Sequence, residues 1–103
     1  MQSASNVTDD NFRDILGQAS GVVMFIKKLC PNCKAMEKML AKFFDANPGI
    51  QYISVDSEEC PEAMKANDVQ RVPTILVLKN GTITGRKVGL MNVREMTAFY
   101  LSA

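Results

Sequence analysis

The stretch Cys30-Pro31-Asn32-Cys33 constrains this chain more than any other, because it lies between two strong secondary-structure patterns. Before it, residues 22–26 form a continuous apolar run, which is typical of a strand covered on both faces. After it, apolar residues recur at helical spacing up to Ala46. A helix that begins at Pro31 makes Cys30 its N-cap and Cys33 a first-turn residue on the same side. The sequence therefore predicts a dithiol whose two sulfur atoms can meet at a helix start.

A helix start favours the thiolate form of Cys30, because unpaired backbone N–H groups and a partial positive charge lie there. The charge contributes about 0.3–1 kcal/mol. We therefore expect Cys30, at an exposed tip, to attack a substrate disulfide, and Cys33, one turn inside, to resolve the mixed disulfide. Closing the four-residue ring gains only roughly 2 kcal/mol, which suits a bond that cycles rather than one that staples the fold.

Pro31 and Asn32 form the loop between the two cysteines. Pro31 suits the first helical position and stiffens the ring in both redox states. Asn32 can act only by hydrogen bonding. Neither side chain titrates, so the two residues do not by themselves fix the reduction potential of the pair.

The segments around this motif alternate between helix and strand, which predicts an α/β fold. Asn80-Gly81 is the strongest short hairpin signal, so the strand after it should return antiparallel and make the sheet mixed. Asn92 and Glu95 are placed for a capping box at the start of a closing helix. We expect an edge strand at 4–7, a helix that Thr8 caps and that ends near Gly17, strands at 22–26, 50–55, 74–78 and 82–88, helices at 31–46, 61–67 and from 93, and core positions at Met36, Met39, Val93, Met96 and one of Phe99, Tyr100 and Leu101.

Length and composition exclude several classes of protein. The 103 residues suit one domain, 1–103, that folds without disulfide staples. A net charge of +1 with no dense basic block argues against a nucleic-acid partner. No apolar segment approaches the roughly 20 residues of a membrane span and the start is polar, so we expect no membrane partner and a cytoplasmic location. The absence of His excludes hydrolases built on a Ser-His or Cys-His pair.

Other interpretations of the cysteines stay open at this point. The pair can be structural or fortuitous. It can also bind a metal, although a zinc site wants four ligands, and the pair with Cys60 supplies three unless two chains pool theirs around zinc or an iron–sulfur cluster. Cys60, which precedes Pro61 at a helix start, is either a modifiable surface thiol or an ordinary small side chain. The favoured interpretation assigns no metal and no cofactor.

The chain resembles the thioredoxins over residues 7–101. Four markers in this order carry the resemblance: the Cys-x-x-Cys after a central strand, Val72-Pro73-Thr74 at the start of a later strand, the Lys79-Asn80-Gly81 hairpin, and Lys87-Val88-Gly89 before the last helix. The resemblance implies a thioredoxin fold, with a central mixed sheet of four to five strands and about four helices. It also implies a cis peptide bond before Pro73 that faces the dithiol, a Val72 backbone that pairs with the substrate, and close substrate approach at Gly89.

The resemblance further implies a function. It is that of a monomeric, cytoplasmic protein-disulfide reductase, which acts on disulfide-containing proteins and is recharged by a separate reductase. A Pro after the first Cys is also similar to the glutaredoxins, so a glutathione-dependent oxidoreductase is one alternative. A thioredoxin-fold binding module, in which the dithiol matters little, is another.

Four positions depart from the usual thioredoxin pattern. Leu29 stands in place of Trp, Pro31-Asn32 in place of Gly-Pro, and Met24 and Tyr52 in place of a buried Asp and its Lys partner. Without that ionisable pair, we expect water, the Cys30 thiolate or a backbone group to help deprotonate Cys33. Leu29 is also expected to form an apolar docking patch around the dithiol, together with Pro31, Val72 and Leu90 or Met91.

Overall fold

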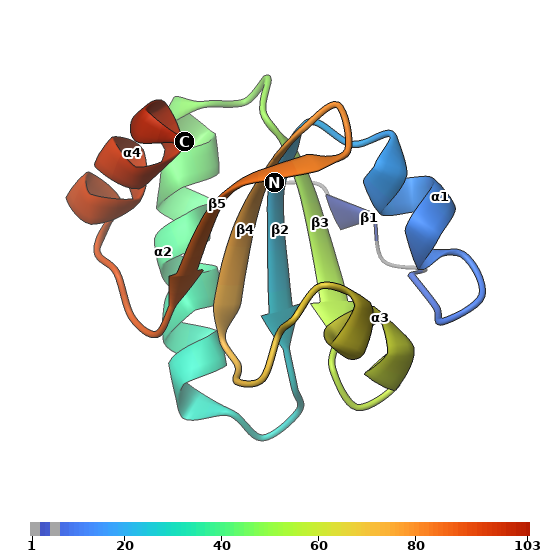
Figure 1. Cartoon of the computed structure of the whole chain (residues 1–103). Coiled ribbons are helices and arrows are strands. Elements are labelled where there is room, and N and C mark those ends of the chain that lie inside the picture. Colours follow the sequence, from blue (N-terminus) through green and yellow to red (C-terminus); the bar gives the residue numbers. More distant parts are fainter. Residues whose placement is uncertain (1–2, 5–6) are drawn as a thin grey trace.

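A five-stranded sheet forms the centre of the fold (Figure 1). The computed structural model describes residues 3–4 and 7–103. The strand order is β1-β3-β2-β4-β5; β1, β3 and β2 run parallel, and β4 and β5 are antiparallel to their neighbours. The strands are β1 (Ser3–Ala4), β2 (Gly21–Ile26), β3 (Gln51–Asp56), β4 (Thr74–Lys79) and β5 (Thr82–Val88).

Helices cover both faces of this sheet, which is why its central strands are apolar on both sides. They are α1 (Phe12–Gly17), α2 (Pro31–Ala46), α3 (Pro61–Ala66) and α4 (Val93–Ser102). Figure 1 shows α2 and α4 on one face and α1 and α3 on the other. Alternate residues of β2 divide accordingly, because Val23 and Phe25 pack in the cluster with α1 and α3, whereas Val22 and Met24 pack with α2 and α4.

The expected α/β fold with a central mixed sheet is therefore confirmed, and the sheet has five strands. The expected edge strand at 4–7 is only partly found, because β1 covers Ser3–Ala4 and residues 5–6 lie outside the described residues. The expected cap was wrong in its detail: Asn11 is the N-cap of α1, and the Thr8 hydroxyl accepts from the backbone N–H of Asp10 and Asn11 in the preceding turn.

Asn80 and Gly81 form the hairpin that joins β4 and β5, as their sequence predicts. Both residues have positive φ, 51° and 80°, which is the backbone of the tight turn that suits twisted strands. A Cβ at Gly81 would collide with the Gly17 carbonyl group, and the Gly81 N–H donates to the Ala19 carbonyl oxygen at 2.9 Å. The hairpin thus also packs against the end of α1.

The closing helix α4 begins with the predicted capping box, in which Asn92 and Glu95 satisfy each other's backbone N–H groups. Met96 is fully buried, and Val93, Phe99 and Tyr100 are partly buried against the same cluster. Leu101 was a wrong candidate for the core, because 77% of it is exposed. Met36 and Met39 of α2 are buried as expected. None of the helices in the described part of the chain is long and apolar enough to cross a membrane.

Strand register brings three loops to one end of the sheet. Phe25, near the end of β2, pairs with Thr74 at the start of β4, and Thr74 pairs with Val88 at the end of β5. The residues that follow β2, those that precede β4 and those that follow β5 therefore share this end. These are the segments that carry Cys30, Pro73 and Gly89. We call this edge of the molecule the dithiol end.

Candidate active site

The dithiol occupies the first turn of α2, the longest helix. Cys30 is the N-cap with extended backbone (φ −117°, ψ 102°), and Pro31 is the first helical residue. A disulfide joins Cys30 to Cys33, with their Cα atoms 5.2 Å apart. The backbone N–H of Cys33 also donates to Cys30 Sγ at 3.2 Å. The helix start therefore presents a hydrogen bond to the sulfur that the sequence predicts as nucleophile, which favours a thiolate there.

The two cysteine residues are covered to different degrees. Cys30 is 6% exposed and Cys33 only 1%. The expectation that Cys30 forms an exposed tip is thus wrong in this disulfide-bonded state, although Cys30 is the more accessible of the two. The exposed positions are its neighbours Leu29, Pro31 and Asn32, which rim the disulfide.

Leu29, immediately before Cys30, combines two unusual properties. Its backbone is left-handed (φ 55°), a conformation that costs a leucine roughly 1–2 kcal/mol. Its side chain is 92% exposed, the most of the large apolar residues that the structure describes as exposed. The backbone turns the chain from the β2 exit into the start of α2, and the same turn leaves an apolar side chain in water beside the disulfide.

The loop before β4 lies across the dithiol end. The Val72–Pro73 peptide bond is cis, as the resemblance implies. The Thr74 hydroxyl donates to the Arg71 carbonyl oxygen at 2.6 Å, and the Gly89 N–H donates to the Pro73 carbonyl oxygen at 3.0 Å. Gly89 has a φ of 91°, and no atom lies within 4 Å of where its Cβ would be. The second of these bonds holds Gly89 against Pro73, and the space at the Gly89 Cα is open.

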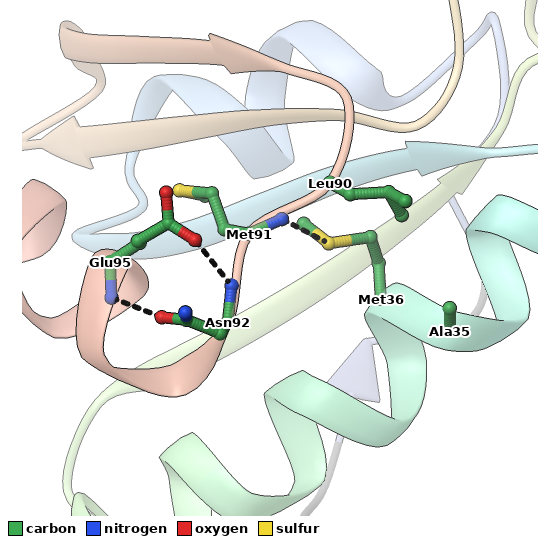
Figure 2. Close-up of a pocket in the computed structure, with 6 residues that line it drawn as sticks. All are labelled: Ala35, Met36, Leu90, Met91, Asn92 and Glu95. Atoms are coloured by element: carbon green, nitrogen blue, oxygen red, sulfur yellow. Dashed lines mark hydrogen bonds between the residues drawn. The ribbon is translucent and has the colours of Figure 1, made fainter.

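A groove of about 290 Å³, which we call the Met36 groove, lies between the start of α2 and the segment that joins β5 to α4 (Figure 2). Met36 and Met91 are both almost fully buried beneath it, and the Met91 N–H donates to the Met36 thioether sulfur at 3.3 Å. Of the two residues expected beside Leu29, Leu90 is the exposed one, at 55%, whereas Met91 lies in the floor of this groove. Its lining residues are Ala35, Met36, Leu90, Met91, Asn92 and Glu95.

Sequence reasoning did not assign Ala35, Met36 or Glu95 to any surface near the dithiol. The capping box was the available signal, because it fixes where the chain after Gly89 turns back into α4 and hence where Glu95 lies. One carboxylate oxygen of Glu95 accepts a hydrogen bond of 3.1 Å from the Asn92 N–H, and Figure 2 shows the other oxygen turned away from Asn92. The groove is thus apolar along its floor with one carboxylate at its edge.

The core cluster against α2 and α4 contains Met24 and Tyr52, the two residues expected in place of a buried Asp and its Lys partner. Met24 is completely buried, and Tyr52 is 5% exposed in the same cluster. Burial, and secondarily the nearby carboxylate of Glu37, raise the pKa of Tyr52 well above its ordinary value. Its hydroxyl therefore stays protonated at neutral pH and does not serve as a base. Thr74 is the only polar residue in the buried core of the described chain.

Cys60 has a different environment from the pair. It is completely buried, and its thiol donates to the Val7 carbonyl oxygen at 3.3 Å. Burial raises the pKa of this thiol, and the carboxylates of Asp9, Asp56 and Glu59 raise it further. The possibility of a modifiable surface thiol is therefore wrong, and the ordinary small side chain is the correct interpretation. Among the described residues no group of three or more Cys, Asp or Glu side chains is arranged to hold a metal ion.

Comparison with known proteins agrees with this geometry. The family model described as thioredoxin matches residues 3–101. Thioredoxin-3, mitochondrial, of Saccharomyces cerevisiae is 30% identical over 86 residues, which are 82% of this chain and 66% of that protein. Thioredoxin C-2 of Corynebacterium nephridii is 27% identical over 97 residues, 91% of this chain and 90% of that protein.

A solved structure shows the likeness over the whole length. The solution structure of reduced desulfothioredoxin from Desulfovibrio vulgaris Hildenborough is 38% identical, superposes with a TM-score of 0.81, and covers 99% of this chain and 100% of that one. Together with the match of the family model and the Cys30–Cys33 pair at the start of α2, this settles the family. The chain belongs to the thioredoxin family of thiol–disulfide oxidoreductases.

Proposed function

We propose that this protein is a thiol–disulfide oxidoreductase that reduces disulfides in other proteins. The observation that carries the proposal is the Cys30–Cys33 disulfide on the first turn of α2, where the Cys33 N–H also donates a hydrogen bond to Cys30 Sγ. A disulfide that closes a ring of only four residues adds little to the stability of the fold, so we assign it to redox cycling. Cys30, the more exposed of the two residues, is also the one that the helix start favours as a thiolate.

The reaction takes two exchange steps. The Cys30 thiolate attacks one sulfur of the substrate disulfide, and the other substrate sulfur leaves as a thiolate that takes up a proton. The Cys33 thiolate then attacks Cys30 Sγ, the mixed disulfide breaks, and the second substrate thiolate leaves and is protonated. Two electrons pass to the substrate and Cys30–Cys33 becomes oxidised. A separate reductase must return two electrons and two protons before the next cycle.

The loops at the dithiol end are proposed to hold the substrate. The Val72 backbone pairs with the substrate chain beside Pro73, and Gly89 lets that chain approach closely because the space at its Cα is open. Leu29, Pro31 and Leu90 supply apolar surface around the reacting sulfurs. The groove above Met36 and Met91 extends that surface along α2.

Deprotonation of Cys33 is proposed to occur without a buried acid–base pair. Met24 lies in the buried cluster at the position where most thioredoxins carry an aspartate, and the Tyr52 hydroxyl is held protonated. Cys30 Sγ is part of the mixed disulfide when Cys33 attacks and cannot accept its proton, so one acceptor is the substrate thiolate that the first step releases. Water that enters with the substrate is the other acceptor.

The cytoplasm is the compartment we propose, because a reducing environment keeps such a dithiol in its reduced form.

Turbidity from reduced insulin in the presence of dithiothreitol tests the proposal. The variant Cys30→Ser should fall to the rate of dithiothreitol alone, because no nucleophile remains. The matched control, Cys60→Ala, should keep the wild-type rate. The variant Cys33→Ser should trap a mixed disulfide that is visible on a non-reducing gel. Full turnover by Cys30→Ser would contradict the mechanism.

Two further measurements separate the rival functions. Titration of the dithiol against a glutathione redox buffer should place its potential on the reducing side of the glutathione couple, and a more oxidising potential would indicate an oxidase. Protein purified without a chelator should contain no stoichiometric zinc or iron. Metal in proportion to protein would favour a shared metal site between two chains instead.

A further inference from the structure

A second groove, of about 400 Å³, opens at the dithiol end beside the Val72–Pro73 loop, because Arg71 and Thr74 on either side of that loop both line it. Thr74 and Val88, which pair with each other across β4 and β5, form part of its wall. Nothing in the proposed exchange reaction uses this groove. Its lining differs from that of the Met36 groove, because it is the more polar of the two and carries two arginines. The lining residues are Asp68, Val69, Gln70, Arg71, Thr74, Arg86 and Val88.

The two arginine side chains differ in their hydrogen bonds. Arg86 is fixed in place, since its guanidinium donates to the carbonyl oxygens of Asn67 and Asp68 at 2.7 and 3.1 Å and so closes the end of α3. The Arg71 side chain is exposed, and within residues 3–4 and 7–103 its guanidinium has no hydrogen bond or ion pair. Only its backbone carbonyl is engaged, by the Thr74 hydroxyl. Arg71 therefore presents five unused donors two residues before Pro73.

One carboxylate opposes this charge. Asp68 also lines the groove, and one of its oxygens accepts from the Gln70 side chain at 3.4 Å. The groove thus keeps a net positive charge from two arginines and one aspartate. The Met36 groove has the opposite character, because Glu95 is the one charged residue in its lining. A polypeptide that crosses the dithiol end meets positive charge on the Arg71 side and negative charge on the Glu95 side.

We propose that Arg71 is a specificity-determining residue that binds the carboxylate of an Asp or Glu close to the reacting cysteine of a protein substrate. This rests on the proposed function. The planar guanidinium suits a carboxylate, which it can bind through two parallel hydrogen bonds. A protein substrate fits better than a small acidic disulfide, because Leu29 and Leu90 leave apolar surface beside the same disulfide that a partner with side chains of its own can cover.

The experiment uses disulfide-linked peptides that are identical except for one residue near the cysteine, which is Glu, Gln or Lys. The wild-type protein should reduce the Glu peptide with a kcat/KM about twofold to fivefold above that of the Gln peptide, as expected for an exposed ion pair, and the Lys peptide more slowly than either. Added salt should shrink the difference. Arg71→Gln should remove the preference for Glu and leave the rate on the Gln peptide unchanged.

Two variants sharpen the comparison. Asp68→Asn should enlarge the preference for Glu, because it removes the opposing carboxylate. Arg13→Gln is the matched control, since Arg13 lies on α1 over the Phe12 ring, carries the same charge and is outside the groove. It should keep the wild-type preference.

The outcomes distinguish this proposal from the one on which it rests. Equal wild-type rates on the three peptides would overturn the role of Arg71 and leave the reductase standing. No reduction of any peptide would defeat the proposed function itself. If Arg71→Gln slows the reduction of oxidised glutathione but not of the Glu peptide, the groove takes a small anion and the proposal is wrong.

Discussion

Two cysteines in this protein hold the same local position in surroundings that are opposite in character. Cys30 is the N-cap of α2 and Cys60 is the N-cap of α3, and a proline follows each as the first helical residue. On local sequence alone both thiols lie where a helix start favours a negative charge. The contrast shows which further features turn a thiol at a helix start into a nucleophile.

The amide of the third helical residue makes the first difference. In α2 it belongs to Cys33 and donates to Cys30 Sγ at 3.2 Å. In α3 it belongs to Ala63 and donates to Asp9 Oδ1 at 3.2 Å, as does the N–H of Glu62 at 3.1 Å. A carboxylate from the N-terminal segment therefore occupies the site that a thiolate at Cys60 would need. The Cys60 thiol, left without a cap bond, becomes a donor to Val7.

Charge and cover make the second difference. The lysines at 27, 28 and 34 lie close to Cys30 in the chain, and all three are exposed. Carboxylates surround Cys60, and with burial they raise its pKa. Residues 7–9 also bond over the start of α3, whereas Leu29 and Asn32 beside the dithiol are open to water. A helix start thus allows a thiol to become a nucleophile but does not make it one. Whether it does depends on the presence of a second cysteine, on the sign of the nearby charge and on whether a partner can reach the sulfur.

The largest expected effect is in thiol reactivity. In the reduced protein at neutral pH, iodoacetamide should modify Cys30 more than about a hundredfold faster than Cys60, because Cys60 is covered and held as a thiol. Mass spectrometry of peptides over a time course measures both rates in one sample. Denaturant should bring Cys60 to the rate of an ordinary thiol. Comparable rates in the native protein would mean that the cover over Cys60 is open.

A transplanted dithiol tests whether spacing alone suffices. In a Cys30→Ser, Cys33→Ser background, the change Ala63→Cys creates a second Cys-Pro-x-Cys at the start of α3. We expect no insulin reduction above that of dithiothreitol, because the new pair lies beneath residues 7–9, among carboxylates and on a helix of 6 residues. The parent double variant is the control. Activity in this protein would show that spacing outweighs environment.

The same contrast marks how far the sequence alone was informative. The dithiol, its helix start and the mixed sheet were predictable, because Cys30, Pro31 and the apolar run before them act through neighbours in the chain. The hairpin at Asn80-Gly81 was predictable for the same reason, since its turn depends on two residues. All of these signals are local.

What could not be predicted depends on partners distant in the chain. The bond from Cys60 to Val7 spans 53 residues, and that from the Met91 N–H to Met36 spans 55. No sequence signal near Cys60 predicts that residues 7–9 cover it. The small exposure of Cys30 was missed similarly, because only the strand register brings the loops at 72–73 and 89–91 to the same end of the sheet as Cys30. The surface charge of the groove that Arg71 lines likewise arises from two segments that are distant in the chain, residues 68–71 and Arg86.

A moderate effect is expected from removing the Asp9 carboxylate, which accepts the backbone N–H groups of Glu62 and Ala63 at the start of α3. Asp9→Ala should destabilise the protein by about 0.5–2 kcal/mol, the usual cost of losing a helix cap. Cys60 should then react roughly fivefold to thirtyfold faster if the loss is one to two kcal/mol, because local opening becomes more frequent. Urea unfolding and iodoacetamide labelling measure the two changes. Asp10→Ala, in the adjacent exposed position, should alter neither.

The smallest effect near neutral pH concerns how the buried groups titrate. Folding raises the pKa of Cys60 and that of Tyr52, so the native state holds both protons more tightly than the unfolded chain, where these groups titrate near about 8.5 and 10. Their contribution to stability is therefore complete below about pH 8 and is lost as pH rises, first through Cys60 and then through Tyr52.

Urea unfolding of the oxidised protein from pH 7 to 11 checks this, because the Cys30–Cys33 disulfide does not titrate and leaves Cys60 as the thiol under observation. The free energy of unfolding should begin to fall above about pH 8.5. The difference between wild type and Cys60→Ala isolates the first part of that fall, and the difference from Tyr52→Phe isolates the second. If the wild type and Cys60→Ala lose stability in parallel between pH 8 and 10, the fold does not hold Cys60 as a thiol, and the contrast with Cys30 must then rest on access alone.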